Sequence, residues 1–173
     1  MKKKLPFIII GAVVLLALLG FGYVKVLQYF GGLEKEANTA SYGALTLTLS
    51  DDYVETDLEG RDIIYANNNF SVSINEYTYA YFMERGTTIE TKEDFAKFLQ
   101  DINPEYNFGE MHKADDYVYF IYDTLYYGKS YSRQVAILEN NDNFYVVIVE
   151  CYTSSSHLLE DEFEKIMDTA EFN

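Results

Sequence analysis

The chain of 173 residues has no tryptophan, one cysteine, two prolines and two histidines. The lone Cys151 excludes an intramolecular disulfide, and with it the class of small secreted domains that disulfides hold together. It also lies far beyond the N-terminal apolar run, which excludes a lipoprotein. His112 and His157 are far apart in sequence and have no cysteine or aspartate at ligand spacing, so we expect no zinc site.

Basic residues are scarce beyond the N-terminus. The chain has 13 basic and 28 acidic residues, and five of the basic ones precede residue 38. Residues 38–173 therefore hold 8 basic and 26 acidic residues, a formal charge of −18. Such a field repels nucleic acid and disfavours binding flat on anionic lipid headgroups. Solubility outside the cytoplasm accounts for this charge, and cationic partners or divalent ions are the alternatives.

One long apolar run is present near the start of the chain. Residues 5–24 carry no charge and follow three consecutive lysines. A helix of this length covers about 30 Å, the thickness of the hydrocarbon core of a bilayer. The lysines favour a cytoplasmic N-terminus. We therefore expect a cytoplasmic basic tail at 1–4, a single transmembrane anchor at 5–27 and an extracytoplasmic remainder. The alternative is a cleaved secretory signal, whose apolar region is usually only about 7 to 15 residues long.

The segment 28–43 is interpreted as a stalk. Gly31 and Gly32 open a polar stretch that has neither the alternation of a strand nor a helical apolar face. The remaining residues, 44–173, have a normal length for one domain with a single core.

The first half of this domain predicts three strands and a helix. Leu45, Leu47 and Leu49 alternate with polar residues, which is typical of a strand with one buried face. Residues 63–65 and 70–74 predict a hairpin around the turn at 67–69. Thr91 can cap a helix whose apolar residues recur at helical spacing, namely Phe95, Phe98, Leu99 and Ile102.

The second half predicts a meander and a final helix. Strands are expected at 117–123, 131–139 and 144–152, and the last is apolar on both faces, as in a central strand covered on both sides. Ser154–Ser156 offer an N-cap for a helix that carries one apolar stripe, Leu159, Phe163, Ile166, Met167 and Ala170. The order βββ-α-βββ-α predicts an α+β fold, with helices packed on a mainly antiparallel sheet.

The C-terminal third also carries a family resemblance. The strand Phe144–Cys151, a short polar loop, the helix residues Phe163–Met167 and the terminal Phe172 together resemble the PsbP/Mog1-like family, which includes small membrane-anchored bacterial proteins. The resemblance covers most of residues 44–172. It implies a non-enzymatic domain that binds or stabilises other proteins, as photosystem and Ran-binding members do. No binding residues of those members can be matched here.

Other candidate sites have plainer interpretations. Cys151 and His157 could form a thiol and base pair, but a cysteine on an apolar strand face behaves as a small hydrophobe. Asp115–Asp116 and Asn140–Asn143 offer oxygen ligands for calcium, yet neither matches the twelve-residue calcium loop, and turn chemistry explains both. We therefore predict no catalytic, cofactor-binding or metal-binding residues.

Tyrosine is the most unusual component, with 17 residues. Tyr77, Tyr79 and Tyr81 alternate along one expected strand or its extension. Strands favour tyrosine because its ring packs while its hydroxyl stays hydrated. The alternative is a recognition surface, because tyrosine is enriched at interfaces. The candidate protein-binding surface surrounds the expected turn at 125–131 and consists of Tyr117, Tyr119, Tyr122, Tyr126, Tyr127 and Tyr131.

Three classes of function follow. The first is a single-pass, membrane-tethered extracytoplasmic domain without catalytic activity, which acts as an interaction or assembly-accessory factor for a membrane or envelope complex. The second is a module that binds a glycan or peptide at the envelope. A concave aromatic cleft would favour this second class, whereas a flat or convex tyrosine surface would favour protein docking. The third is a hydrolase, which would need two carboxylates with strongly shifted pKa values in a cleft.

Overall fold

The computed structural model describes residues 38–56 and 64–173. The expected tail at 1–4, the anchor at 5–27 and the first part of the stalk lie outside these residues. Within the described ranges, no helix combines the length and the apolar character needed to span a membrane.

The fold is α+β, as expected. The strands are β1 (Asn38–Tyr42), β2 (Leu45–Leu49), β3 (Val54–Thr56), β4 (Ile64–Ala66), β5 (Phe70–Thr78), β6 (Asn107–Phe108), β7 (His112–Lys113), β8 (Tyr117–Tyr126), β9 (Lys129–Asn140), β10 (Asn143–Tyr152) and β11 (Glu171–Phe172). The helices are α2 (Tyr79–Met83), α3 (Lys92–Ile102), the 3-10 helix η1 (Thr153–Leu158) and α4 (Leu159–Met167).

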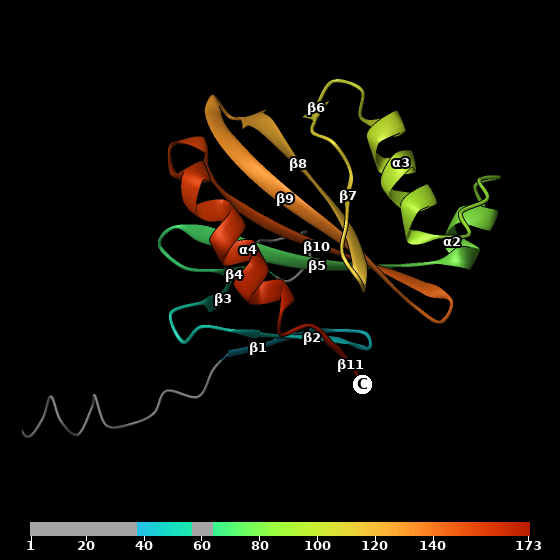
Figure 1. Cartoon of the computed structure of the whole chain (residues 1–173), viewed down its shortest axis with the longest axis horizontal. Helices are drawn as coiled ribbons and strands as arrows, with labels where there is room; N and C mark the ends of the chain where they lie inside the picture. The colour runs from blue at the N-terminus through green and yellow to red at the C-terminus, as the bar shows by residue number, and fades with distance from the viewer. Residues whose placement is uncertain (1–37, 57–63) are drawn as a thin grey trace, which may run out of the picture. The chain divides into compact units, whose positions relative to one another are not determined.

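The strands form two antiparallel sheets (Figure 1). The larger has eight strands, in the order β3-β4-β5-β10-β9-β8-β6, with β7 also paired to β8. The smaller has three strands, in the order β1-β2-β11. The expected meander is confirmed, because β8, β9 and β10 pair consecutively. One expectation is corrected: the sequence predicted one mainly antiparallel sheet, whereas the leucine strand β2 belongs to a separate, smaller sheet.

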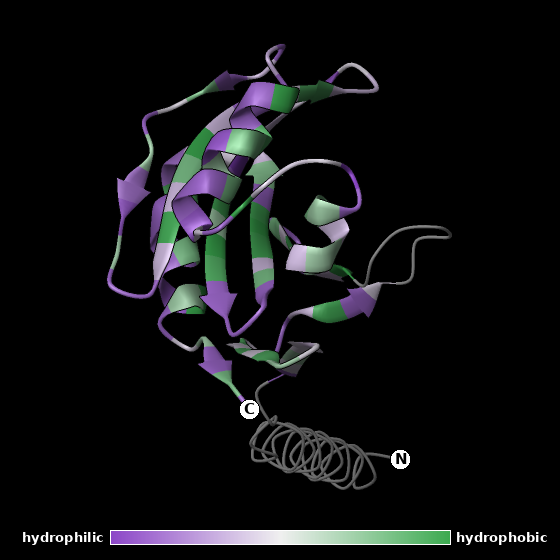
Figure 2. Cartoon of the chain, turned by 90° about the vertical axis from the view of Figure 1, so that its right-hand side faces the viewer, coloured by the Kyte–Doolittle hydropathy of each residue, from purple (hydrophilic) through white to green (hydrophobic). Residues whose placement is uncertain are grey.

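The central strand β10 is covered on both sides, as its sequence predicts. Phe144 and Val146 belong to a core closed by α2 and α3. Tyr145, Val147 and Val149 belong to a second core, which α4 and the smaller sheet close. The strands in the middle of the sheet are hydrophobic along much of their length, and the helices have one hydrophobic side (Figure 2). Each large side chain buried in these cores contributes about 1.5–3 kcal/mol to folding.

The hairpin of β4 and β5 forms around the expected asparagine turn. The side-chain oxygen of Asn67 accepts the backbone N–H groups of Asn69 and Phe70, at 2.9 and 2.8 Å. This side chain therefore satisfies donors that the tight turn leaves unpaired, which is why asparagine is favoured there.

Helix α3 begins at the expected cap. The Thr91 side chain accepts the N–H of Asp94, and the Asp94 carboxylate accepts the N–H of Thr91, which completes a capping box. Phe95 is buried. Ile102 was expected on the buried stripe but is exposed, because it is the last helical residue and lies beyond the sheet contact.

The stalk prediction is wrong for its last residues. Asn38–Tyr42 form β1, which pairs along its whole length with β2. Only Ala40 is fully buried on this strand. One small buried residue produces no alternation of apolar and polar residues, so the sequence of this segment does not predict a strand. The strand forms because it pairs with the leucine strand β2.

The start of the last helix also differs from the expectation. Ser154–Ser156 lie within η1, and no side chain caps α4. The backbone runs from one helix directly into the next, and the N–H of Leu159 donates to the carbonyl of Ser156. Because the preceding turn supplies carbonyl acceptors, a side-chain cap is not needed. The expected apolar stripe of α4 is confirmed as buried, apart from the half-buried Ala170.

Candidate functional site

The six tyrosines expected to share one surface lie in three different places. Tyr117 and Tyr119 are half-buried beside α4, with ring centroids 6.0 and 5.7 Å from that of Phe163. Tyr122 lies on the opposite sheet face and is only 8% exposed. Its ring stacks on Tyr106 at 5.1 Å. The separation follows from the strand period of two, which sends odd and even residues of β8 to opposite faces.

The other three tyrosines lie together at the end of the β8–β9 hairpin. The Tyr126 and Tyr127 rings are 4.5 Å apart, and the Tyr131 ring stacks on Tyr152 at 5.0 Å. Tyr152 comes from β10 and was not in the expected set. Lys129 donates to the Tyr152 hydroxyl at 3.3 Å. We call this group, Tyr126, Tyr127, Lys129, Tyr131 and Tyr152, the tyrosine patch.

Within the patch, the pKa of Tyr152 is lowered, whereas that of its neighbour Tyr131 is raised. The hydrogen bond from Lys129 lowers the pKa of Tyr152, and a hydrogen bond with Tyr131 lowers it further. The same two interactions with Tyr152 raise the pKa values of Lys129 and Tyr131. The patch is therefore a surface of aromatic rings with one cation among them.

The hairpin turn itself has an unusual residue. Tyr127 and Gly128 both have positive φ, 48° and 75°, as a two-residue type I′ turn requires. Asparagine normally fills the first of these positions, and in the β9–β10 turn the residue with positive φ is an asparagine, Asn141, with φ 53°. A tyrosine in this conformation costs roughly 1–2 kcal/mol. Yet the Tyr127 ring is 89% exposed and gains little packing in return.

A groove runs along the sheet face that carries α3, from beneath the helix onto the part that α3 leaves uncovered. Its central cavity has a volume of about 220 Å³ and is lined by Ile64, Ser71, Ser73, Asn75, Arg133, Ile148 and Glu150. A second cavity of about 160 Å³ under α3 shares Asn75 and Ile148 with it. A third, of about 150 Å³, shares Ser71 and Glu150 and reaches Tyr131 and Tyr152. We call these three adjoining cavities the sheet groove, and its far end meets the tyrosine patch.

An ion pair lies on the floor of the sheet groove. The Arg133 Nε donates to Glu150, and the two side chains are 27% and 21% exposed. Arg133 Nη1 donates to the Tyr122 hydroxyl at 3.3 Å. Burial opposes the charge on Arg133, but Tyr122 and Glu150 outweigh it, so the pKa of Arg133 is raised. Both charges are therefore held in the groove and neutralise each other. Sequence reasoning had missed this pair.

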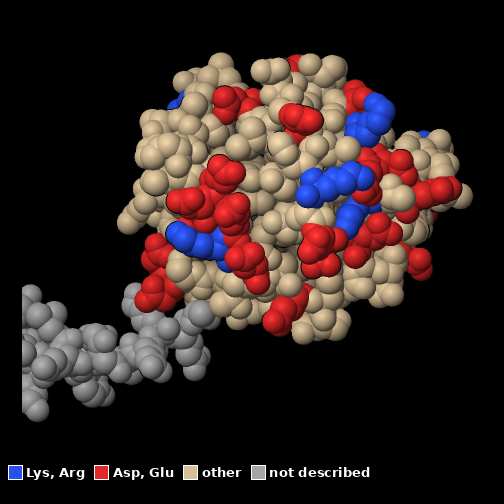
Figure 3. Space-filling model, in the orientation of Figure 1, with Lys and Arg blue, Asp and Glu red and all other residues tan. Residues whose placement is uncertain are grey.

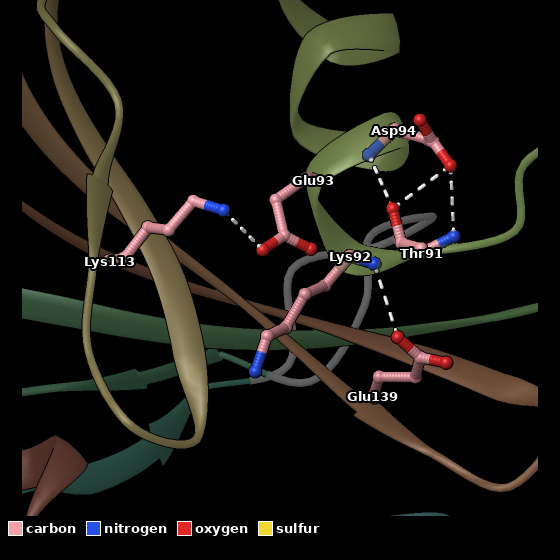
Figure 4. A network of polar contacts seen from close by, with 6 residues as sticks. All are labelled: Thr91, Lys92, Glu93, Asp94, Lys113 and Glu139. Carbon is pink, nitrogen blue, oxygen red and sulfur yellow. Dashed lines mark hydrogen bonds and ion pairs between the residues drawn. The ribbon is translucent and has the colours of Figure 1, made fainter.

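One wall of the groove, helix α3, is fixed by a carboxylate from β9 (Figure 4). Glu139 Oε2 accepts the first helical N–H, that of Lys92, at 3.1 Å. Its other oxygen accepts the Tyr79 hydroxyl at 2.7 Å. A carboxylate is favoured at a helix N-terminus because the helix dipole is positive there. The bond to Glu139 also raises the pKa of Tyr79 to about 12, with smaller contributions from burial and neighbouring carboxylates.

A second contact ties the same helix end to β7. Lys113 donates to Glu93 at 2.8 Å (Figure 4). This hydrogen bond is the main cause that lowers the pKa of Glu93. The ion pair is largely exposed, so it positions α3 more than it stabilises it.

The remaining candidates from the sequence have structural roles. Cys151 is buried, and burial raises its thiol pKa, which disfavours a nucleophile. His112 stacks on the ring of Tyr119 at 5.1 Å. The aspartates at 115–116 lie in the bend between β7 and β8, and Asn141 and Asp142 form the turn between β9 and β10, as expected. Asn140 and Asn143 are the strand residues on either side of that turn. Within residues 38–56 and 64–173, no three His, Cys, Asp or Glu side chains are grouped so that they could hold a metal ion.

Comparison with known proteins identifies the fold. No protein-family model and no curated protein matches the sequence. Among solved structures, cyanobacterial PsbP from Synechocystis sp. PCC 6803 has a TM-score of 0.53 and 10% identity, over 82% of this chain and 96% of that one. The Ran-binding protein Mog1p of Saccharomyces cerevisiae has a TM-score of 0.53 and 9% identity, over 79% and 96%.

A third neighbour is a longer protein of Bacteroides thetaiotaomicron VPI-5482, with a TM-score of 0.52 and 13% identity. The match covers 80% of this chain and 49% of that protein. The expected PsbP/Mog1-like fold is thus confirmed, and identities this low show the fold alone.

Proposed function

We propose that this chain is a non-catalytic protein-interaction or assembly-accessory domain, tethered to the extracytoplasmic side of the cell membrane by the anchor at 5–27. The PsbP/Mog1-like fold supports a binding role, because the yeast neighbour with this fold is a Ran-binding protein. The charge-free run that follows three lysines supports the tether and its orientation.

The proposed docking surface is the tyrosine patch, and the observation that carries this assignment is Tyr127. Its left-handed backbone is unfavourable for tyrosine, and its ring is almost fully exposed. Because Tyr127 destabilises the turn and is not buried, folding does not explain a tyrosine at this position, and a role in binding does. Exposed tyrosines supply large contact area at little entropic cost, which suits a protein interface.

The charge of the domain defines the partner more closely. Residues 38–173 carry a formal charge of −18, and the patch is a ring-rich area with one lysine. A partner with an apolar or aromatic centre and a basic rim would complement both features. An acidic or anionic-lipid surface would be repelled.

The test of the docking surface is Tyr127→Asn in the full-length chain. Asparagine suits the turn, so we expect the free energy of unfolding to rise by about 0.5–1 kcal/mol, while recovery of crosslinked partner from native membranes falls at least fivefold. A variant that is more stable than the parent chain but recovers less partner has lost docking and not folding.

Asn141→Gly is the matched control, because it alters the left-handed residue of the other hairpin turn and should leave recovery unchanged. Partner recovery by Tyr127→Asn equal to that of the parent chain would rule out the patch as the docking surface.

The tether has its own test. We expect the full-length chain to stay in the membrane fraction after an alkaline carbonate wash, and the fragment 38–173 to be released. Protease added to protoplasts or spheroplasts, in which the cell membrane is intact, should degrade the domain. A full-length chain found in the soluble fraction, or protected from external protease, would contradict the proposed location.

A further inference from the structure

We propose that the sheet groove is a binding site for a short neutral glycan. The site extends from the cavity under α3 onto the uncovered part of the same sheet face, and its proposed contacts include no residue of the tyrosine patch. Three features carry it: unpaired polar side chains along one strand, an aromatic wall beside them, and a groove floor whose charges cancel.

The unpaired polar groups come from β5. Ser71, Ser73 and Asn75 alternate along the strand and all line the central cavity. Within the part of the chain that the structure describes, the side chains of these three residues make no hydrogen bond to another residue. A row of hydroxyl and amide groups can both donate and accept, which is what the hydroxyl rim of a saccharide requires.

The strand register brings this row beside the ion pair. Ser71 is the cross-strand partner of Glu150, and Glu150 is the partner of Arg133. A ligand hydroxyl can therefore donate to Glu150 and accept from Arg133 at the same place, since both side chains keep part of their surface exposed.

The aromatic wall occupies the adjoining cavity under α3. Tyr106 and Tyr122 stack on each other there. The ring centroid of Phe108 is 5.9 Å from that of Tyr106 and 4.9 Å from that of Tyr122. The C–H face of a sugar ring is apolar and packs on aromatic rings in the way that other apolar groups do. Asn75 lines both cavities, so it lies where the rim and the face of one sugar would meet.

Charge decides between ligand classes. Arg133 already bonds to Glu150, so an anionic ligand would have to displace an internal carboxylate and approach an acidic domain. A cationic ligand would face the guanidinium of Arg133. A neutral, hydroxyl-rich ligand meets neither penalty. The cavities, of about 220 and 160 Å³, are small for a pocket and suit a short saccharide.

The test uses the full-length chain in a detergent without a sugar headgroup. Three soluble neutral probes, triacetylchitotriose, maltotriose and cellotriose, are each screened by saturation-transfer NMR at about 10 mM, which would reveal even a millimolar site. We expect at least one probe to receive saturation. The double variant Ser71→Ala and Ser73→Ala should weaken its binding about tenfold, because each lost hydrogen bond costs a factor of a few.

The matched control is Ser154→Ala with Ser156→Ala, which removes two hydroxyls from η1, outside the groove, and should leave affinity unchanged. Saturation transfer to none of the three probes would overturn the proposal, as would equal affinity of the parent and the Ser71/Ser73 variant. The proposal would also be overturned if a charged tripeptide bound to the chain and none of the three trisaccharides did. Tyr127→Asn should bind the glycan normally, so failure here and failure of the docking surface are distinguishable.

Discussion

At the scale of single residues, tyrosine hydroxyls add to the few cations as hydrogen-bond partners for carboxylates. The chain has 28 acidic and 13 basic residues, so its carboxylates outnumber the lysines and arginines that could pair with them. Three tyrosine hydroxyls donate to glutamates at 2.7–2.8 Å, in the pairs Tyr53 with Glu162, Tyr79 with Glu139 and Tyr145 with Glu76. Each bond needs a protonated tyrosine, and the pKa of every one of these tyrosines is raised.

Tyr79 gives a prediction for alkaline pH. Its folded-state pKa is about 12, against 10 for an ordinary tyrosine. A raised folded pKa means that the stabilisation is fully present below about pH 10 and is lost as the pH rises towards about pH 12. We expect Tyr79→Phe to lower the free energy of unfolding at pH 8 by about 1 kcal/mol and to make its fall between about pH 10 and 12 shallower. Urea denaturation at a series of pH values measures both effects.

Tyr81→Phe is the control, because it removes an exposed hydroxyl two residues away that lacks this carboxylate partner. A pH dependence of Tyr79→Phe identical to that of the parent chain would show that the bond to Glu139 does not set the alkaline limit.

At the scale of elements, one side chain of β9 links the start of α3 to the start of α2, where the strand β5 ends. Glu139 bonds both to the first N–H of the helix and to Tyr79, which precedes it in α2. We predict that Glu139→Ala lowers the free energy of unfolding by about 2 kcal/mol, because it removes the acceptor of the Lys92 N–H and the shorter hydrogen bond of the Tyr79 hydroxyl. The Tyr79 hydroxyl keeps the carbonyl of Glu90 as an acceptor, at 3.1 Å. Denaturant unfolding measures this value.

Glu93→Gln is the comparison for that measurement. It breaks the exposed ion pair with Lys113 at the same helix end and should cost less than about 1 kcal/mol. If both variants cost the same, the anchoring role assigned to Glu139 would be wrong.

Elements with a strong local pattern were predictable from the sequence, and elements made by distant pairing were not. The alternation in Leu45–Leu49, the two apolar faces of β10 and the cap at Thr91 each identify an element without reference to the rest of the chain. The strands β6, β7 and β11 have two residues each, which is too short for any period. They exist because longer strands offer them free edges.

The same distinction explains the candidate sites. The position of Tyr126 and Tyr127 at the end of a hairpin was predictable because Gly128 marks the turn there. The pair of Arg133 and Glu150 is 17 residues apart and meets only through the register of β9 and β10. One signal was present in the sequence: Glu150 interrupts an otherwise apolar central strand. A charge in such a place requires a partner, although the sequence alone does not say which.

At the scale of the whole molecule, like charges repel one another. Acidic side chains outnumber basic ones on the face that carries α4 (Figure 3). With 26 acidic and 8 basic residues in 38–173, compaction brings many carboxylates closer together than they are in the unfolded chain. This self-repulsion lowers stability, and salt screens it, since the screening length falls from about 30 Å at 0.01 M to about 3 Å at 1 M.

The last prediction tests this repulsion through charge reversal on α4. Glu164 and Asp168 are exposed at the C-terminal end of the helix, where the helix dipole favours cations. We expect Glu164→Lys with Asp168→Lys to raise the melting temperature at low salt, by roughly 2–4 °C for each kcal/mol gained. The parent chain should gain more from added sodium chloride than this variant does, because the variant has four units less negative charge to screen. Thermal unfolding of both proteins at about 0.01 and 0.5 M salt makes the comparison. An equal gain from salt in both would mean that repulsion among these carboxylates is not what limits stability, and the acidic surface would then act only on solubility and on the choice of partner.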